Sequence, residues 1–463
     1  MTDDREILPP PYRVSNGRLR VLQAAIALFA QKPAGSVSAW ADAHRILPSK
    51  SASESGRWRT SRTPYLKAIM DDLSVESPVQ RVVFIKSTQV GATEAGLNWL
   101  GWFIATQRAP MMCVQPTIEM AERFSKQRLT PMIDVTPTLR AIIPPARSRD
   151  SGNTTLMKDY PGGMLILSGA NSSASLRSMP AKYLFLDEID AYPLDLNGEG
   201  DPVALAEARL STFSGRKVFL CSTPTIESLS RIQKEWVASN QQRYYVPCPH
   251  CGSKNPLNWQ NLHWPEHQPE AALYECPDCR TPIAEHHKTR MLELGEWRAE
   301  HPERSIHGYH INALYTPIGL GLSWPELAAK FERVKKDPAQ YKTFINTILG
   351  ECFADPDEKF EADEIQDRAE SYALRTVPAG CSLITAGMDV QKDRFALILL
   401  GHGRNNVVWV LDYIELPADP TRPMDWAILD DALSQVFPDA HGLEHRITAA
   451  AIDSGYLPDE VLY

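Results

Sequence analysis

The sequence predicts an α/β protein whose first large domain is built on a parallel sheet, and three observations support this fold class. Between residues 81 and 222, short apolar runs such as RVVFIK, MMCVQP, MLILSG, YLFLD and KVFLCS alternate with helical patterns, as in a sheet of buried parallel strands. Four cysteines form two closely spaced pairs between residues 248 and 279. After residue 381, three strand-like runs and a helical stretch follow. A length of 463 residues suits such a division into two or three domains.

The first segment, residues 1–60, is expected to be an N-terminal arm with one helix over residues 18–32. Its acidic start, MTDDREILPPPYR, is unlike a signal peptide. No apolar run in the chain reaches about 18 residues, the length of a membrane span. The net charge of −9 indicates no global attraction to nucleic acid, and it is compatible with local basic patches. We therefore expect a cytoplasmic protein with no membrane partner.

A phosphate-binding loop is predicted where the strand RVVFI runs into IKSTQVGATEAG. A helix N-terminus and the N–H groups of a preceding loop attract phosphate. The stretch departs from the pattern G-x-x-x-x-G-K-[ST], because Ala92 stands at the lysine position. Lys86 at the front of the loop offers a replacement for the missing cation, and Thr93 a ligand for Mg²⁺; an ordinary strand-to-helix turn is the alternative. The predicted nucleotide contacts in this loop are Lys86, Ser87, Gln89, Gly91 and Thr93.

Acidic side chains follow the apolar strand YLFLD directly, in the stretch KYLFLDEIDAYP. In a Walker B arrangement, the first acid holds Mg²⁺ and the second orients or deprotonates the attacking water. Asp187 and Glu188 occupy these positions. A solvated loop after a core strand is the alternative interpretation.

A third strand, KVFLCS, ends in Ser222-Thr223-Pro224. A polar residue on the strand beside Walker B is suited to sensing the γ-phosphate, and we expect Thr223 to couple hydrolysis to movement. Alone, this stretch also fits a plain strand-end turn. The three signals in this order favour an ATP site more than any one of them does.

The cysteine cluster is the most specific single motif. CPHC supplies Cys248 and Cys251, and CPDC supplies Cys276 and Cys279, with 24 residues between the pairs. This spacing predicts a tetrahedral zinc site in a small ribbon. Because four cysteines close the coordination sphere, we expect the zinc to be structural. The four other cysteines are scattered among apolar neighbours, which favours a reducing compartment over a disulfide scaffold.

Together, IKSTQVGAT, YLFLDEIDAYP, GEGDPVALAEARLSTF, CSTPT and TAGMDVQKDRFAL resemble the large subunit of a tailed-phage terminase of the lambda-type (GpA) family. The resemblance covers about residue 40 to the end. It implies a RecA/ASCE-like P-loop ATPase domain followed by an RNase H-like nuclease, with ATP and Mg²⁺ or Mn²⁺ as cofactors. The implied segments are the arm over 1–60, the ATPase domain over 61–243, the zinc ribbon over 244–285, a helical linker over 286–375 and the nuclease over 376–463.

The resemblance also implies partners and further site residues. Double-stranded DNA, a small terminase subunit bound near residues 21–30, a portal protein and a homo-oligomeric ring are expected, in the cytoplasm of a bacterial host. Tyr65 in RTPYLKAIM matches an upstream aromatic residue for adenine. Arg177 and Arg209 are candidates for an arginine that stabilises charge in hydrolysis; surface arginines are the alternative.

The implied nuclease depends on acids at strand ends. Asp389 ends the apolar strand ITAGMD, and Asp453 ends AAAID. Two metal ions about 4 Å apart require several converging carboxylates, and Glu415 and Asp393 are candidate helpers. The family's third essential acid and its portal-docking tail would lie beyond Tyr463, so the nuclease site is expected to be incomplete in this chain.

Two other functions fit parts of the sequence. LDEID resembles the box of a superfamily-2 helicase, but no second RecA-like half with an arginine-rich motif follows. A non-enzymatic zinc-ribbon adaptor on a decayed ATPase fold is favoured slightly by Ala92. Nucleotide binding and hydrolysis separate these alternatives.

Overall fold

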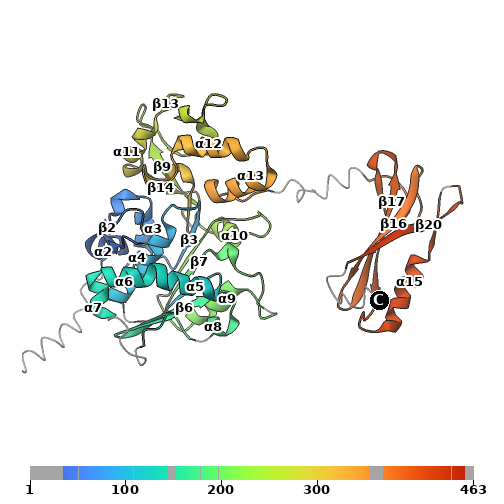
Figure 1. The fold of residues 1–463 in the computed structure, drawn as a ribbon, viewed down its shortest axis with the longest axis horizontal. Helices are drawn as coiled ribbons and strands as arrows, with labels where there is room; N and C mark the ends of the chain where they lie inside the picture. Colours follow the sequence, from blue (N-terminus) through green and yellow to red (C-terminus); the bar gives the residue numbers. More distant parts are fainter. Residues whose placement is uncertain are drawn as a thin grey trace, which may run out of the picture. The chain divides into compact units, whose positions relative to one another are not determined.

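A computed structural model of the chain describes residues 35–50, 52–107, 109–143, 152–177, 179–196, 198–354, 369–439 and 441–453. The helix expected over 18–32 and the proposed small-subunit contact lie outside these residues. The chain divides into two compact units, residues 1–358 and 359–463 (Figure 1). Among the described residues, no helix combines the length and apolar character that crossing a membrane requires.

A mixed sheet forms the centre of the first unit. Its strand order is β10-β9-β15-β3-β8-β7-β4-β6-β5, and β14 pairs with β9. The six neighbouring pairs from β9 to β6 are parallel, and β5, β10 and β14 are attached antiparallel. The strands are β3 (Arg81–Lys86), β4 (Met111–Gln115), β5 (Met157–Tyr160), β6 (Gly163–Gly169), β7 (Tyr183–Asp187), β8 (Lys217–Ser222), β9 (Gln242–Pro247), β10 (Lys254–Pro256), β14 (Glu296–Ala299) and β15 (His307–Ile311).

Helices cover both faces of this sheet, because successive residues of a strand point to opposite faces. In β3, Val82 and Phe84 join one hydrophobic core, while Val83 and Ile85 join the other. The first core packs α2 (Val37–His44), α3 (Leu66–Asp72), α4 (Ala92–Thr106), α5 (Ile118–Phe124), α6 (Thr130–Val135) and α7 (Pro137–Ile142). The second packs α8 (Ser173–Arg177), α9 (Pro202–Glu207) and α10 (Arg231–Ala238).

The expected strands β3, β4, β6, β7 and β8 are confirmed, but the sheet extends beyond the predicted range 61–243. Strand β15 lies between β9 and β3, although it falls in the range 286–375 that was expected to be a helical linker. Strand β9 begins at Gln242, so the sheet also enters the predicted ribbon range. Five-residue strands such as HGYHI carry too short a pattern to be separated from loops by periodicity.

Helices do follow β15, as expected: α12 (Trp324–Val334), α13 (Pro338–Phe344) and the π-helical turn η9 (Ile345–Leu349). The ribbon adds the three-stranded sheet β11 (Leu262–His263), β12 (Leu273–Glu275) and β13 (Pro282–Ile283), followed by α11 (Lys288–Glu293).

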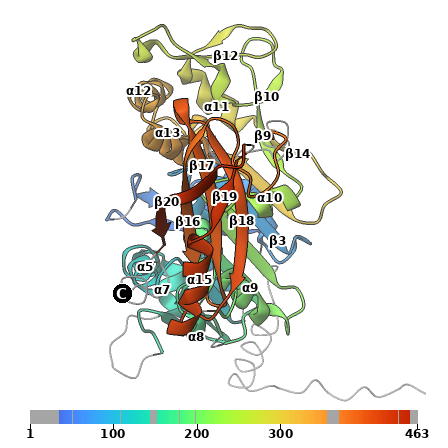
Figure 2. The ribbon, with the colours of Figure 1, turned by 90° about the vertical axis from the view of Figure 1, so that its right-hand side faces the viewer.

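The second unit is a five-stranded sheet with the order β18-β17-β16-β20-β19. Strands β16 (Cys381–Val390), β17 (Arg394–Gly403) and β18 (Val408–Pro417) are antiparallel, and β20 (Glu444–Ile452) runs parallel to β16. This is the expected RNase H-like arrangement. Helix α15 (Trp426–Leu433) packs its apolar side on one face (Figure 2).

The helix expected over residues 424–437 is shorter than predicted. It ends at Leu433, and Val436–Pro438 form β19, which pairs antiparallel with β20. The β-branched and aromatic pair Val436 and Phe437 suits a strand, and the strand pairing overrides the helical pattern.

Candidate nucleotide and metal sites

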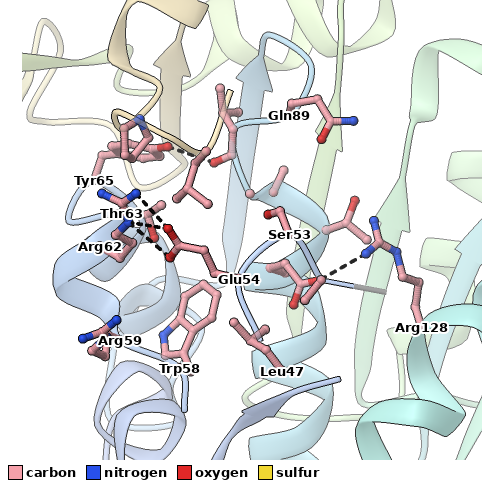
Figure 3. A pocket seen from close by; sticks show the side chains of 18 of the residues that line it. Leu47, Ser53, Glu54, Trp58, Arg59, Arg62, Thr63, Tyr65, Gln89 and Arg128 are labelled. Atoms are coloured by element: carbon pink, nitrogen blue, oxygen red, sulfur yellow. Dashed lines mark hydrogen bonds and ion pairs between the residues drawn. The ribbon is translucent and has the colours of Figure 1, made fainter. Parts of the chain in front are cut away.

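A cavity of about 500 Å³ opens at the carboxyl ends of the parallel strands, the edge where such sheets bind ligands. The phosphate loop and the start of α4 line one side. Residues from the preceding segment line the other, including Trp58, Arg59 and Arg62 (Figure 3). Arg62 bridges this wall, because its guanidinium pairs with Glu54 at 2.8 Å and donates to the carbonyl of Ile318.

The loop between β3 and α4 contains two left-handed residues. Gly91 caps α4 in the left-handed region with φ 87°, and Gln89 is also left-handed at 62°. The first bond of the helix runs from the N–H of Ala95 to the carbonyl of Gly91 at 2.9 Å. The N–H groups of the first helical turn are therefore not used within α4. Lys86, Gln89, Gly91 and Thr93 all line the cavity.

Ser87, by contrast, is buried behind the loop. Its side chain is fully covered, and its hydroxyl is among the buried groups without a hydrogen-bond partner in the described part of the chain. Its N–H donates to the carbonyl of Ile311 at 2.9 Å, and the N–H of Thr88 donates to that of Thr347 at 2.8 Å. The front of the loop is thus fastened to β15 and η9.

Lys86 and Glu188 meet across the cavity although they are 102 residues apart in the sequence. The ammonium of Lys86 is 2.5 Å from Oε1 of Glu188. Burial lowers the pKa of Lys86, but the charge of Glu188 and of neighbouring acidic groups outweighs it and raises the pKa overall. Glu188 has the left-handed φ of 55°, a costly conformation for this residue type and one associated with functional sites.

Thr223 lies beside Glu188, as the proposed coupling role requires. Its N–H donates to Oε2 of Glu188 at 3.2 Å, and its hydroxyl is 3.5 Å from the same oxygen. The hydroxyl of Ser222 adds a 3.4 Å contact. The end of β8 therefore holds one carboxylate oxygen of Glu188 while Lys86 holds the other.

Asp187 is buried behind Glu188 and is held from both neighbouring strands. Gln115 Nε2 donates to its Oδ2 at 3.2 Å, and the Cys221 thiol donates to Oδ1 at 3.1 Å. Burial, followed by repulsion from Glu188, raises the pKa of Asp187. Nearby positive charge stabilises the ionised form of such a carboxylate. The carboxylate of Asp187 is therefore suited to binding a cation.

Tyr65 is among the residues that line the cavity but is buried, whereas Arg177 lies outside the lining. Tyr65 is 0% exposed and donates its hydroxyl to the carbonyl of Val90 at 3.2 Å. Its ring packs edge-on against Tyr244, so Tyr65 supports the cavity wall and has no open face for adenine. Arg177 does not line the cavity, and it pairs with Glu199 at 2.7 Å.

The sequence analysis missed Glu94 and Arg128, which line the cavity from α4 and the π-helical turn η2 (Ser125–Leu129). No sequence pattern marks Arg128. Gln115 was also missed, although its position gave a signal, since a polar residue ending an apolar strand resembles the pattern that identified Asp187.

The four predicted zinc ligands converge. Their sulfur atoms all lie within 4.8 Å of one another, with Cys248–Cys279 and Cys251–Cys276 at 3.9 Å. A tetrahedron with zinc–sulfur bonds of about 2.3 Å has edges of about 3.8 Å, so the two distances of 3.9 Å are close to those of a zinc site. Among the described residues, this is the only group of three or more potential ligands at such distances.

Both cysteine pairs adopt the same turn. The N–H of Cys248 donates to Ser253 and that of Gly252 to Cys248; the N–H of Cys276 donates to Thr281 and that of Arg280 to Cys276. The fourth residue after the first cysteine is left-handed in each turn, with φ 78° at Gly252 and 57° at Arg280. This repeated geometry accounts for the convergence of the four thiols.

In the second unit, Asp389 and Asp453 lie at the ends of neighbouring parallel strands. Met388 is in register with Ile452, and the N–H of Asp453 donates to the carbonyl of Met388 at 2.8 Å. Glu415 is separated from Asp389 by β17, because each of them faces Ala396. Two strand spacings place its backbone about 10 Å away, and Arg394 lies 3.7 Å from its carboxylate. The structure does not place Glu415 beside the Asp389–Asp453 pair.

Known proteins resemble this chain along most of its length. Residues 52–297 match the family described as "Phage terminase large subunit gpA, ATPase domain", and residues 306–462 match "Terminase large subunit gpA, endonuclease domain". The large terminase subunit of Enterobacteria phage P21 is 28% identical over 484 aligned positions, covering 97% of this chain and 73% of that protein. That of Escherichia phage lambda is 26% identical, covering 94% and 71%.

Among solved structures, the large terminase of bacteriophage HK97 covers 93% of this chain and 77% of its own, with 14% identity and a TM-score of 0.44. The superfamily-2 helicase is not favoured by these matches, since the second matched family is an endonuclease. The chain therefore belongs to the phage terminase large subunit gpA family, and it is an ATPase and endonuclease for packaging and cutting phage DNA.

Proposed function

We propose that the cavity at the end of β3 is the ATP site of the packaging motor. The observation that carries this assignment is the meeting of Lys86 and Glu188 beside the N-terminus of α4, with Thr223 on the same carboxylate. The loop N–H groups and the helix N-terminus bind the phosphates, and Thr93 and Asp187 hold Mg²⁺. The bound Mg²⁺ supplies charge stabilisation at the transferring phosphoryl group.

Lys86 changes partner when ATP enters. Without nucleotide, Lys86 neutralises Glu188 inside the cavity. A γ-phosphate competes for the ammonium, and Glu188 is then released to orient the attacking water and accept its proton. Thr223 keeps its contact with Glu188, so the loss of the γ-phosphate is transmitted to the end of β8. Ser87 makes no phosphate contact in this scheme, because its side chain is buried and its N–H is donated to the carbonyl of Ile311.

Arg177 lies outside the cavity of its own chain. If this residue stabilises charge during hydrolysis, it acts in the cavity of a neighbouring subunit, which agrees with a ring-shaped homo-oligomer. The adenine is placed against the wall that contains Trp58 and Arg62, and the buried Tyr65 supports this wall.

The cutting activity is assigned to Asp389 and Asp453, which hold Mg²⁺ or Mn²⁺ at the edge of the RNase H-like sheet. A divalent metal held by these two carboxylates would supply activation of the attacking water and charge stabilisation at the leaving oxygen. Glu415 is a poorer candidate, because it lies one strand further away and beside Arg394. The four cysteines hold a structural Zn²⁺, and the distances of 3.9 Å support this.

We assign double-stranded DNA, the small terminase subunit and the portal protein as partners, by membership in the family, and the cytoplasm of the infected bacterium as the location. The ATPase unit includes β15, so the boundary between the two activities is placed after η9.

DNA-stimulated ATP hydrolysis tests the ATP site. Lys86→Ala is expected to abolish turnover and weaken ATP binding, while Glu188→Gln keeps binding and loses turnover. Lys336→Ala, which removes an exposed lysine that does not line the cavity, is the matched control and keeps both. Wild-type turnover in Lys86→Ala would refute the role of Lys86. A loss of ATP binding in Glu188→Gln as large as its loss of turnover would refute the role of Glu188.

A further inference from the structure

Glu94 forms a cluster with two arginines at the start of α4. Its Oε2 lies 2.9 Å from Nη2 of Arg45, and its Oε1 lies 3.5 Å from Nη1 of Arg128. Arg45 is buried, with a side chain 1% exposed, whereas Arg128 is 40% exposed and lines the cavity together with Glu94. Figure 3 shows Arg128 reaching toward the cavity from the side opposite Arg62.

A carboxylate in this place would repel a nucleotide. Glu94 is the third residue of α4, so its charge lies within one turn of the N–H groups that are proposed to bind phosphate. Like charges in a confined site oppose each other. Arg45 is held in place by Glu94 and by the carbonyl of Ile46, so it neutralises Glu94 permanently from the buried side. Arg128 is not needed for that neutralisation.

The contact between Arg128 and Glu94 is weak enough to be exchanged. At 3.5 Å it is longer than an ordinary charge-assisted hydrogen bond. Because Arg128 is partly exposed, solvent screening reduces the strength of the pair. A phosphate group offers a guanidinium two parallel hydrogen bonds, which suits the planar fork of an arginine.

The backbone around Arg128 gives an independent indication. Helices α5 and α6 continue into each other through the π-helical turn η2, which contains Arg128. π-helical turns within α-helices occur frequently at functional sites. The turn is anchored by the buried Ser125, whose hydroxyl donates to the carbonyl of Thr155.

We propose that Arg128 contacts the phosphates of the bound nucleotide, exchanging Glu94 for a phosphate oxygen when ATP enters. This inference rests on the proposed ATP site. It adds a second cation to a loop whose own sequence supplies only Lys86. Arg45 acts as the partner that keeps Glu94 neutral when Arg128 moves.

The test compares ATP and adenosine binding to the full chain by calorimetric titration. Arg128→Ala is expected to weaken ATP binding about ten-fold or more and to leave adenosine binding unchanged. Arg128→Lys keeps the charge but not the planar fork, and a smaller loss is expected. Arg123→Ala is the control, because Arg123 is an exposed arginine on the adjoining α5 and does not line the cavity.

Each outcome separates the two proposals. If Lys86→Ala weakens ATP binding while Arg128→Ala matches wild type, the ATP site stands and the role of Arg128 is wrong. An equal loss of ATP and adenosine in Arg128→Ala, or the same loss in Arg123→Ala, also overturns it, because the effect is then structural. Unchanged ATP binding in Lys86→Ala overturns the placement of the site, and with it this inference.

Discussion

Gly350 lies at the end of η9 and packs against the backbone at the start of the phosphate loop. Its replacement by alanine tests whether this contact positions the loop. The residue is left-handed, with φ 63°. A methyl group there would lie 2.8 Å from the carbonyl carbon of Lys86 and from the nitrogen of Ser87, and 3.1 Å from the carbonyl oxygen of Ile311. These are backbone atoms, so no side-chain rotation relieves the contact.

The expected cost has two parts. A left-handed conformation costs a non-glycine residue about 1–2 kcal/mol, and overpacking against a fixed backbone costs about 1–3 kcal/mol. We therefore expect Gly350→Ala to lower the free energy of unfolding by about 2–5 kcal/mol. Ordinary contact distance is reached only if the loop moves by several tenths of an ångström. Displacements of about 1 Å in catalytic geometry cost up to about 100-fold in rate, so kcat/KM for ATP should fall about ten-fold.

Urea unfolding and steady-state ATP hydrolysis measure the two effects. Gly215→Ala is the matched control, because Gly215 has a similar φ of 68° and no atom within 4 Å of the added methyl group. It should lose only the conformational part, about 1–2 kcal/mol, and keep kcat/KM. Equal destabilisation by the two variants, with wild-type hydrolysis in both, would show that Gly350 does not position the loop.

Three further results are expected. Cys276→Ser should release zinc, measured by metal analysis of the purified protein, whereas Cys352→Ser should retain it; retained zinc in the first variant contradicts the ligand assignment. Asp389→Asn should abolish DNA cutting and leave ATP hydrolysis intact. Asp430→Asn on α15 is the control and should keep both activities. DNA cutting by Asp389→Asn would exclude Asp389 as a ligand of the nuclease metal. Burial lowers the pKa of His310 to about 4 in the folded protein, whereas its value in the unfolded chain is about 6.5. The folded state therefore favours neutral His310, and this stabilisation is complete above about pH 6.5. The free energy of unfolding should fall by up to about 3 kcal/mol between pH 6.5 and 4. His310→Gln should show a shallower fall, and a pH profile identical to that of the wild type would contradict the role of His310.

The candidate sites were predictable where the signal is local in the sequence. Lys86, Gly91 and Thr93 lie in one short loop, and all three line the cavity. Asp187 and Glu188 follow directly from the end of an apolar strand. The burial of Tyr65 was not predictable from its sequence position, because it depends on packing against Tyr244 and other residues far along the chain.

Strands β3, β4, β6, β7 and β8, the loop pattern after β3, the acidic strand end and the spacing of the four cysteines could be read from the sequence alone. These features depend on periodicity and on residues a few positions apart. The position of β15 between β9 and β3, the meeting of Lys86 with Glu188 and the place of Arg128 in the cavity lining became visible only in the folded structure. Strand pairing and side-chain packing bring these groups together across many tens of residues, and no local pattern records which distant partner each one meets.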